Sequence, residues 1–304
     1  MKVIIFSTGR KFEDWRDLPL EQKLSKMKEF IDVHFKNNDE FNHLVSENNG
    51  KLSGIFVMPE YALNQFDEGF EVEPLTKQQI HEVETFIKNE CSVDGLLIIP
   101  GTGLYEKEFT DDKCNKNISK WQSFREKHLE LFHGDNREDL GMLIDQQMET
   151  VTNAEETMFR RNVILAVNNQ QKFSLRKIDD VTDTKEGTVF IPGVKKPSFE
   201  CCGTQVALYI CNDLARGFIL QEEPDINIVV SDAIDLLEIQ EDETKENKTY
   251  LPKGMIIHAC SLSSQSGVMV DGKMLTSPSP TQTPYGDITS YELEVPSNTL
   301  TKSF

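Results

Sequence analysis

Short apolar runs rich in β-branched residues recur along the chain and constrain its fold more than any other feature. They occupy residues 3–6, 54–58, 96–99, 163–167, 206–210 and 226–230. Runs of this length and composition are typical of strands that are buried on both faces of a sheet. Between the first of them lie helical patterns, one starting near Leu20 and another behind a capping box formed by Thr76 and Gln79. This alternation predicts a layered α/β fold.

The segment 106–159 departs from the alternation of strand and helix. It carries two amphipathic helical patterns, one around Trp121 and one around Leu140, and no apolar run of strand length. We interpret it as a helical insertion within a single domain that spans residues 1–304. Its aromatic and methionine positions fit ordinary core packing, and a helical flap beside a pocket is the alternative.

The charge of the chain limits its partners. It has 51 acidic and 32 basic residues, which give a formal net charge of -19. Such a surface repels the phosphate backbone of a duplex and an anionic membrane, so we expect neither a nucleic-acid partner nor a membrane partner. The opening residues turn charged after a short apolar run, and no run of about eighteen apolar residues occurs, which predicts neither a secretion signal nor a membrane-spanning helix.

The cysteines indicate a reducing compartment. Six cysteines at irregular spacing in a chain of 304 residues predict free thiols and a cytoplasmic location. No C-x-x-C pair occurs, and the fragment His258-Ala259-Cys260 lacks a second half, so we expect no metal site. The motif Gly101-Thr102-Gly103 resembles the start of a phosphate-binding loop, but the rest of that loop's motif is absent. We therefore expect a tight turn there. We therefore expect no cofactor.

Three polar residues follow apolar runs and could carry chemistry: Glu60, Lys177 and Cys211. Each has an ordinary structural interpretation when it is taken alone. A cysteine that ends a buried strand often fills the core, and a Glu or Lys just after a strand is often a surface charge. Because polar groups at strand ends can converge in one crevice, their occurrence together favours a shared site.

The sequence words around these residues resemble the Glu-Lys-Cys signature of the nitrilase superfamily of amidases and related enzymes. They are MPE, which ends at Glu60, LRK, which ends at Lys177, and ICND, which contains Cys211. Asn162 stands where that family often has an asparagine before the lysine hairpin. The resemblance spans most of the chain, and residues 106–159 and 234–264 match poorly. It implies a four-layer α-β-β-α sandwich and a homodimer or higher homo-oligomer.

The sequence also departs from the family pattern after the nucleophile. The family commonly reads Cys-x-Asp-x-Arg-Phe-Pro there, whereas this chain keeps Asp213 but has Arg216 and Phe218 displaced. Many members carry a further active-site glutamate, and the candidates for it in the insertion stay unassigned. They are Glu130, Glu138 and Glu155.

The residue types suit amide chemistry. A thiol attacks only as thiolate, and Glu60 can remove its proton. Attack on an amide or nitrile carbon builds negative charge, which the Lys177 ammonium can stabilise. The resemblance implies a second donor, the backbone N–H of Asn212. We therefore expect hydrolysis of a non-peptide carbon–nitrogen bond (amide, carbamoyl or nitrile) in a small-molecule substrate, through a thioester on Cys211.

Three other functions remain open from the sequence. The same thioester could pass its acyl group to an amine, which would make the protein an N-acyltransferase. The chain could instead be a catalytically silent binding or interaction protein with the same fold. A Cys-His hydrolase would use His81 or His258 beside Cys211, although both positions fit structural histidines.

Overall fold

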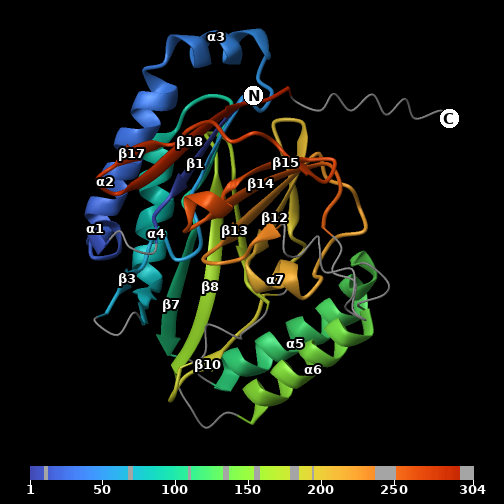
Figure 1. Cartoon of the computed structure of the whole chain (residues 1–304). Coiled ribbons are helices and arrows are strands. Elements are labelled where there is room, and N and C mark those ends of the chain that lie inside the picture. Colours follow the sequence, from blue (N-terminus) through green and yellow to red (C-terminus); the bar gives the residue numbers. More distant parts are fainter. Residues whose placement is uncertain are drawn as a thin grey trace, which may run out of the picture.

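The computed structural model describes residues 1–9, 13–67, 71–108, 111–132, 137–153, 158–178, 185–193, 195–236 and 251–294. Within them, two large β-sheets pack face to face, with helices on their outer sides (Figure 1). This arrangement confirms the predicted α-β-β-α sandwich.

The first sheet has ten strands and runs in the order β17-β18-β1-β2-β6-β8-β7-β5, with β9 and β10 paired to β8. Strands β1, β2 and β6 are parallel neighbours, whereas β18 is antiparallel to β1. The strands are β1 (Lys2–Ser7), β2 (Gly54–Val57), β5 (Leu75–Thr76), β6 (Leu96–Ile99), β7 (Thr102–Glu108), β8 (Met158–Val167), β9 (Lys172–Arg176), β10 (Val189–Phe190), β17 (Thr281–Thr283) and β18 (Gly286–Glu292).

The second sheet has six strands in sequence order, and β12, β13 and β14 are parallel to one another. Its strands are β11 (Ser198–Cys201), β12 (Thr204–Ile210), β13 (Ile226–Ser231), β14 (Met255–Cys260), β15 (Gly267–Val270) and β16 (Lys273–Met274). A separate two-stranded ribbon joins β3 (Gln65–Phe66) and β4 (Val72–Glu73).

Helices cover the outer face of the first sheet, where α2 and α4 pack against its apolar side chains. The capping box predicted at Thr76 and Gln79 is present and begins α4. The helical segments are α1 (Glu13–Arg16), α2 (Leu20–Ile31), η1 (Asp32–Lys36), α3 (Asp39–Glu47), α4 (Lys77–Phe86), η2 (Ile87–Cys91), α5 (Asp111–His128), η3 (Leu129–Leu131), α6 (Arg137–Thr152), α7 (Asn212–Ala215) and η5 (Ser263–Gln265).

The main core lies between the two sheets. Ile5 and Val57 from the first sheet meet Leu208 and Val230 from the second, and all four side chains are fully buried. Because the opposite face of each strand is also covered, its sequence is apolar without alternation. The six predicted apolar runs all lie in strands of these two sheets, apart from Met58, which follows β2.

The helical insertion is an excursion from a β-hairpin. Strand β7 pairs antiparallel with β8 along the whole length of β7, and the last pair joins Glu108 to Met158. The predicted boundaries of 106–159 were therefore too wide by a few residues at each end, because the hairpin extends beyond the apolar stretch that the sequence shows. The helices α5 and α6 lie between these strands in the chain.

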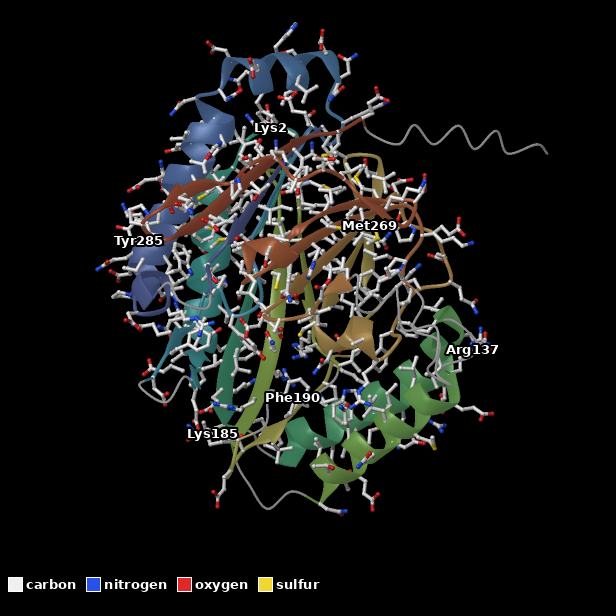
Figure 2. The ribbon with its side chains drawn as sticks, viewed as in Figure 1. Lys2, Arg137, Lys185, Phe190, Met269 and Tyr285 are labelled. Carbon is white, nitrogen blue, oxygen red and sulfur yellow. The ribbon has the colours of Figure 1, made fainter. Side chains whose placement is uncertain are left out.

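The insertion supplies part of the fourth layer. Leu140 and Ile144 of α6 share an apolar cluster with Tyr209 and Val229 on the outer face of the second sheet. Figure 2 labels Arg137, the first residue of α6. The insertion is therefore core structure rather than a detached flap.

The last described strand, β18, runs from Gly286 to Glu292. Two further sequence predictions concern membrane-spanning helices and the cysteines. Among the described residues, no helix combines the length and apolar character that crossing a bilayer requires. The cysteines whose side chains are described are free thiols: Cys91, Cys201, Cys202, Cys211 and Cys260.

Candidate active site

Glu60 lies in a tight loop directly after β2. Its backbone N–H donates to Ser231 O of the second sheet at 3.4 Å, so the loop bridges the two sheets. The next residue, Tyr61, has a positive φ of 57°, and its N–H donates to Thr102 Oγ1 at 2.9 Å. Left-handed backbone at a residue other than glycine is strained and persists only where surrounding contacts hold it. The Glu60 carboxylate is thus fixed in place by its backbone.

The loop that carries Glu60 packs closely against Gly101, which lies in the turn between β6 and β7. It has a φ of 82°, and a Cβ atom there would lie 2.1 Å from Pro59 O. We expect Gly101→Ala to lower the free energy of unfolding by about 2–5 kcal/mol, from left-handed strain plus overpacking. Gly50→Ala is the matched control, because Gly50 has a φ of 80° and open space around it. If urea denaturation shows equal losses of unfolding free energy for Gly101→Ala and Gly50→Ala, the close approach of Gly101 to Pro59 O is contradicted.

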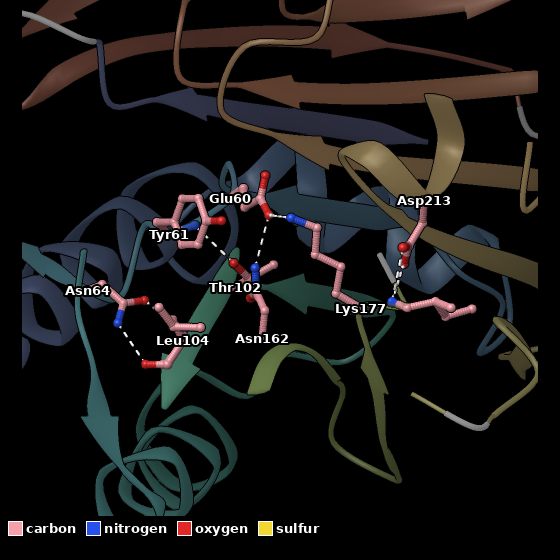
Figure 3. Close-up of polar contacts among 9 residues, drawn as sticks. Glu60, Tyr61, Asn64, Thr102, Leu104, Asn162, Lys177 and Asp213 are labelled. Carbon is pink, nitrogen blue, oxygen red and sulfur yellow. Dashed lines mark hydrogen bonds and ion pairs between the residues drawn. The ribbon is translucent and has the colours of Figure 1, made fainter. Parts of the chain in front are cut away.

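The carboxylate of Glu60 meets two side chains from the β8–β9 hairpin (Figure 3). Lys177 Nζ lies 3.0 Å from Glu60 Oε1, and the two side chains are 0% and 1% exposed. Asn162 Nδ2 donates to the same oxygen at 2.9 Å. A buried carboxylate and ammonium are tolerated only when they compensate each other and are hydrogen-bonded, which is the arrangement found here.

Lys177 follows β9, and hydrogen bonds made by its backbone N–H and C=O groups hold it in place. Lys177 N donates to Asn162 O at 3.0 Å, and Lys177 O accepts from Gly193 N at 2.8 Å. The next residue, Ile178, donates its N–H to both carboxylate oxygens of Asp213, at 2.9 and 3.0 Å (Figure 3). Gln147 of α6 donates to Ile178 O at 2.9 Å. The insertion therefore helps to hold the segment that carries the lysine.

Cys211 forms a strained turn between β12 and α7. Its backbone angles are φ 42° and ψ -112°, and its N–H donates to Val230 O at 2.8 Å. A side chain other than glycine in this region costs on the order of 1–3 kcal/mol, and such outliers cluster at functional sites. The residue is 8% exposed. The turn also makes Asn212 the first residue of α7, whose N–H has no partner within the helix.

Electrostatic interactions connect Cys211 to both other candidates. Burial raises the pKa of the Cys211 thiol most strongly, followed by the charge of Glu60 and a hydrogen bond with the Glu60 side chain. The charge of Lys177 and the backbone of Asp232 act in the opposite direction on this pKa. The charges of Glu60 and Lys177 both act on the Cys211 thiol, so the structure brings the three residues together.

The two histidines considered for a Cys-His pair lie elsewhere. His81 is on α4, with 66% of its side chain exposed, on the outer side of the first sheet. The Nε2 atom of His258 lies 2.7 Å from Ser231 Oγ, and burial lowers the pKa of His258 to about 4. Strand alternation puts His258 on the face opposite Ile257 and Ala259, which line the space between the sheets. By position, His258 is a structural histidine and His81 is a surface residue.

A buried lysine and a tryptophan from the N-terminal helices hold the far end of the Glu60 loop. Trp15 Nε1 donates to Ala62 O at 2.9 Å, and Lys23 Nζ donates to Asn64 O. The Asn64 side chain in turn pairs with both backbone groups of Leu104, at 2.8 and 2.9 Å (Figure 3). None of these supports was identified from the sequence.

Lys23 leads to a pH prediction. Burial, and then the charge of Arg16, lower the pKa of Lys23 to about 7, against the opposing charge of Asp17. In the unfolded chain a lysine titrates near 10.4, so between about pH 7 and 10 the unfolded chain binds more protons. This group therefore makes stability rise with pH, by up to about 1.4 kcal/mol per pH unit.

We expect Lys23→Met to remove that rise, and urea denaturation at pH 7, 8 and 9 measures it. The exposed Lys88, changed to Met in the same way, is the control and should leave the slope unchanged. If the unfolding free energy rises equally with pH in the wild type and in Lys23→Met, the rise does not come from Lys23 and its lowered pKa is refuted.

No group of three or more His, Cys, Asp and Glu side chains that could hold a metal occurs in the described part of the chain. Two of the unassigned glutamates have known positions, Glu130 in η3 and Glu138 in α6, while Glu155 lies outside the described residues. Their assignment stays open. Asp213 was noted in the sequence only as a matching position, and its contact with Ile178 now explains it.

Comparisons with known proteins give similarity at the level of the fold. No protein-family model matches the sequence, and no curated protein matches it. The chain is similar to an amidase from Nesterenkonia sp. AN1 that carries the acetamide moiety of fluoroacetamide at its active-site cysteine. The TM-score is 0.51 at 10% identity, covering 96% of this chain and 90% of that chain. A double mutant of that amidase in complex with acrylamide gives 0.50 at 11% identity, covering 97% and 90%.

A glutamine-dependent NAD+ synthetase from Acinetobacter baumannii, in complex with ADP, is also similar. Its TM-score is 0.50 at 12% identity, and the match covers 96% of this chain and 45% of that chain. The Nesterenkonia amidase is described as belonging to the nitrilase superfamily. The fold of this chain is therefore similar to the fold of these two enzymes.

Proposed function

We propose that the protein hydrolyses a carbon–nitrogen bond of a small amide-type molecule, with Cys211 as the nucleophile. The contact between Glu60 and Lys177, with Cys211 interacting electrostatically with both, is the observation that carries the proposal. Three groups far apart in the sequence converge in a buried place, and one of them stands on a strained turn. Core packing alone requires none of these features.

The proposed reaction begins with a thiol rather than a thiolate. Because burial and Glu60 raise the pKa of Cys211, Glu60 removes the proton as the sulfur attacks the amide carbon. The negative charge that develops on the oxygen is stabilised by the Lys177 ammonium and by the backbone N–H of Asn212. Glu60 then passes the proton to the leaving nitrogen, and the C–N bond breaks to leave a thioester on Cys211.

Hydrolysis of the thioester completes the cycle. Glu60 removes a proton from water, the resulting hydroxide attacks the thioester carbon, and the sulfur leaves and is reprotonated. An amine in place of water would give a new amide, so N-acyl transfer is the nearest alternative. The adduct of the acetamide moiety of fluoroacetamide on the cysteine of the Nesterenkonia amidase retains its amide group, so by analogy of fold it supports a nucleophilic cysteine rather than the thioester step.

Turnover of a panel of small primary amides in the presence of hydroxylamine tests the proposal. A hydrolase with a Cys211 thioester releases ammonia and diverts part of its product to the hydroxamate, while total ammonia is unchanged if acylation limits the rate. An acyltransferase gives acyl transfer with little free acid. A protein that releases no ammonia from any amide, nitrile or carbamoyl compound would be the catalytically silent alternative. The homodimer and the cytoplasmic location stay predictions.

A further inference from the structure

A groove lies on the outer face of the first sheet, between α4 and the β8–β9 hairpin. It encloses a cavity of about 390 Å³, with Lys77 and His81 of α4 on one side and Ser174 and Arg176 of β9 on the other. Strand alternation separates it from the candidate active site, because Leu175 faces the space between the sheets, while Ser174 and Arg176 face outward.

The groove carries positive charge, although the chain as a whole is strongly acidic. Lys77 and Arg176 line it, and the carboxylate among its lining residues, Glu84, is engaged elsewhere. Glu84 Oε2 lies 2.6 Å from Lys172 Nζ, and His81 Nδ1 lies 3.5 Å from the same oxygen. Lys172 therefore offsets the charge of Glu84, and Lys77 and Arg176 remain as the local excess.

Other cations lie near Arg176. Burial and the charge of Arg161 lower the pKa of Arg176, and a hydrogen bond with Tyr105 opposes them. Lys195 is also close, since Arg176 lowers its pKa and Lys195 Nζ donates to Ser174 O at 3.1 Å. Clustered cations repel one another, and an anion between them would relieve that repulsion.

We propose that this groove binds a small molecule through an oxyanion, a phosphate or a carboxylate, held by Arg176 and Lys77. The guanidinium presents paired N–H donors in a fixed plane, which matches the oxygens of either group, and the lysine adds a second charge. The apolar side chains of Ile80, Val163 and Leu165 also line the cavity and would contact the rest of the ligand. A cavity of this volume accommodates a small metabolite.

A molecule bound in the groove would contact β9, the strand that directly precedes Lys177. Arg176 directly precedes Lys177, and Arg176 pairs with Val163 in the β8–β9 ladder. Lys177 N donates to Asn162 O one step further along the same ladder. A ligand in the groove would therefore touch, from outside, the strand whose end carries Lys177.

Isothermal titration with sodium phosphate and, separately, with sodium malonate tests the proposal on the full chain. Sodium chloride at matched ionic strength is the reference for unspecific screening. We expect saturable binding of at least one of the two anions to the wild type. Binding of phosphate alone would assign the site to phosphate esters, and binding of malonate alone would assign it to carboxylates.

Three variants make the result specific. Arg176→Gln and Lys77→Gln should each weaken binding by about tenfold or more, since each removes a charge-assisted hydrogen bond. The exposed Lys51, changed to Gln, should leave binding unchanged. Because Lys77 is exposed, its variant keeps the test valid if Arg176→Gln fails to fold. Binding of neither anion, or equal binding by the wild type and Lys77→Gln, would overturn the proposal, whatever the outcome of the amide assays.

Discussion

The Cys211→Ala protein is expected to lose amide turnover by at least about 10³-fold while it keeps a folded structure. The nucleophile is removed, but alanine fits the space of the thiol and keeps the same backbone turn. Ammonia release measures the activity, and circular dichroism with thermal unfolding checks the fold. The strain at φ 42° remains in the variant, so its stability should stay close to that of the wild type.

Cys91→Ala is the matched control for this substitution. Cys91 is also a buried thiol, and burial raises its pKa to about 12, but it lies on η2 in the outer helical layer. We expect Cys91→Ala to retain turnover and to lose a modest amount of stability from the missing sulfur. Turnover that survives in Cys211→Ala, or that is lost equally in both variants, would refute the assigned nucleophile.

Breaking the buried pair of Glu60 and Lys177 is expected to have the largest effect on stability. Lys177→Met leaves the Glu60 carboxylate buried without the Lys177 ammonium. Glu60→Gln leaves that ammonium buried without the carboxylate. Each single change should cost about 3–5 kcal/mol of unfolding free energy. The double variant removes both charges, so it should recover much of this loss. All three variants should lose turnover.

Urea denaturation of the four proteins gives the coupling energy between the two side chains. The exposed ion pair of Lys253 and Glu223, whose N···O distance is 2.8 Å, provides the reference cycle and should show far weaker coupling. Additive losses in the Glu60 and Lys177 cycle would mean that the two charges do not compensate each other in the folded protein. That result would remove the basis of the site.

Much of the fold could be predicted because burial leaves a direct mark on the sequence. The parallel strands β1, β2, β6, β12 and β13 are covered on both faces, so each appears as an unbroken apolar run. The extensions of β7 and β8 could not be predicted. Their outer parts include polar residues such as Glu106, whose Oε1 accepts from Arg160 Nε at 2.8 Å, and this pairing depends on the hairpin itself.

The candidate site could likewise be predicted only in part from the sequence. Glu60, Lys177 and Cys211 were predicted because each follows a recognisable strand within a family-like word. Their supports were not, because a hydrogen bond such as that from Ile178 N to Asp213, or from Lys23 to Asn64, joins positions with no local pattern. A buried lysine in a helix reads in the sequence as an ordinary surface charge, and only its three-dimensional surroundings show its pKa to be lowered.

Whether Cys211 becomes acylated tests the account most directly. Intact-mass spectrometry with peptide mapping of acid-quenched mixtures would be applied to the wild type incubated with a panel of small amides. The account predicts a gain equal to the mass of the amide minus ammonia, located on the peptide that contains Cys211 and absent from Cys211→Ala. An adduct on another residue, or turnover of an amide without any acyl intermediate on Cys211, would contradict it.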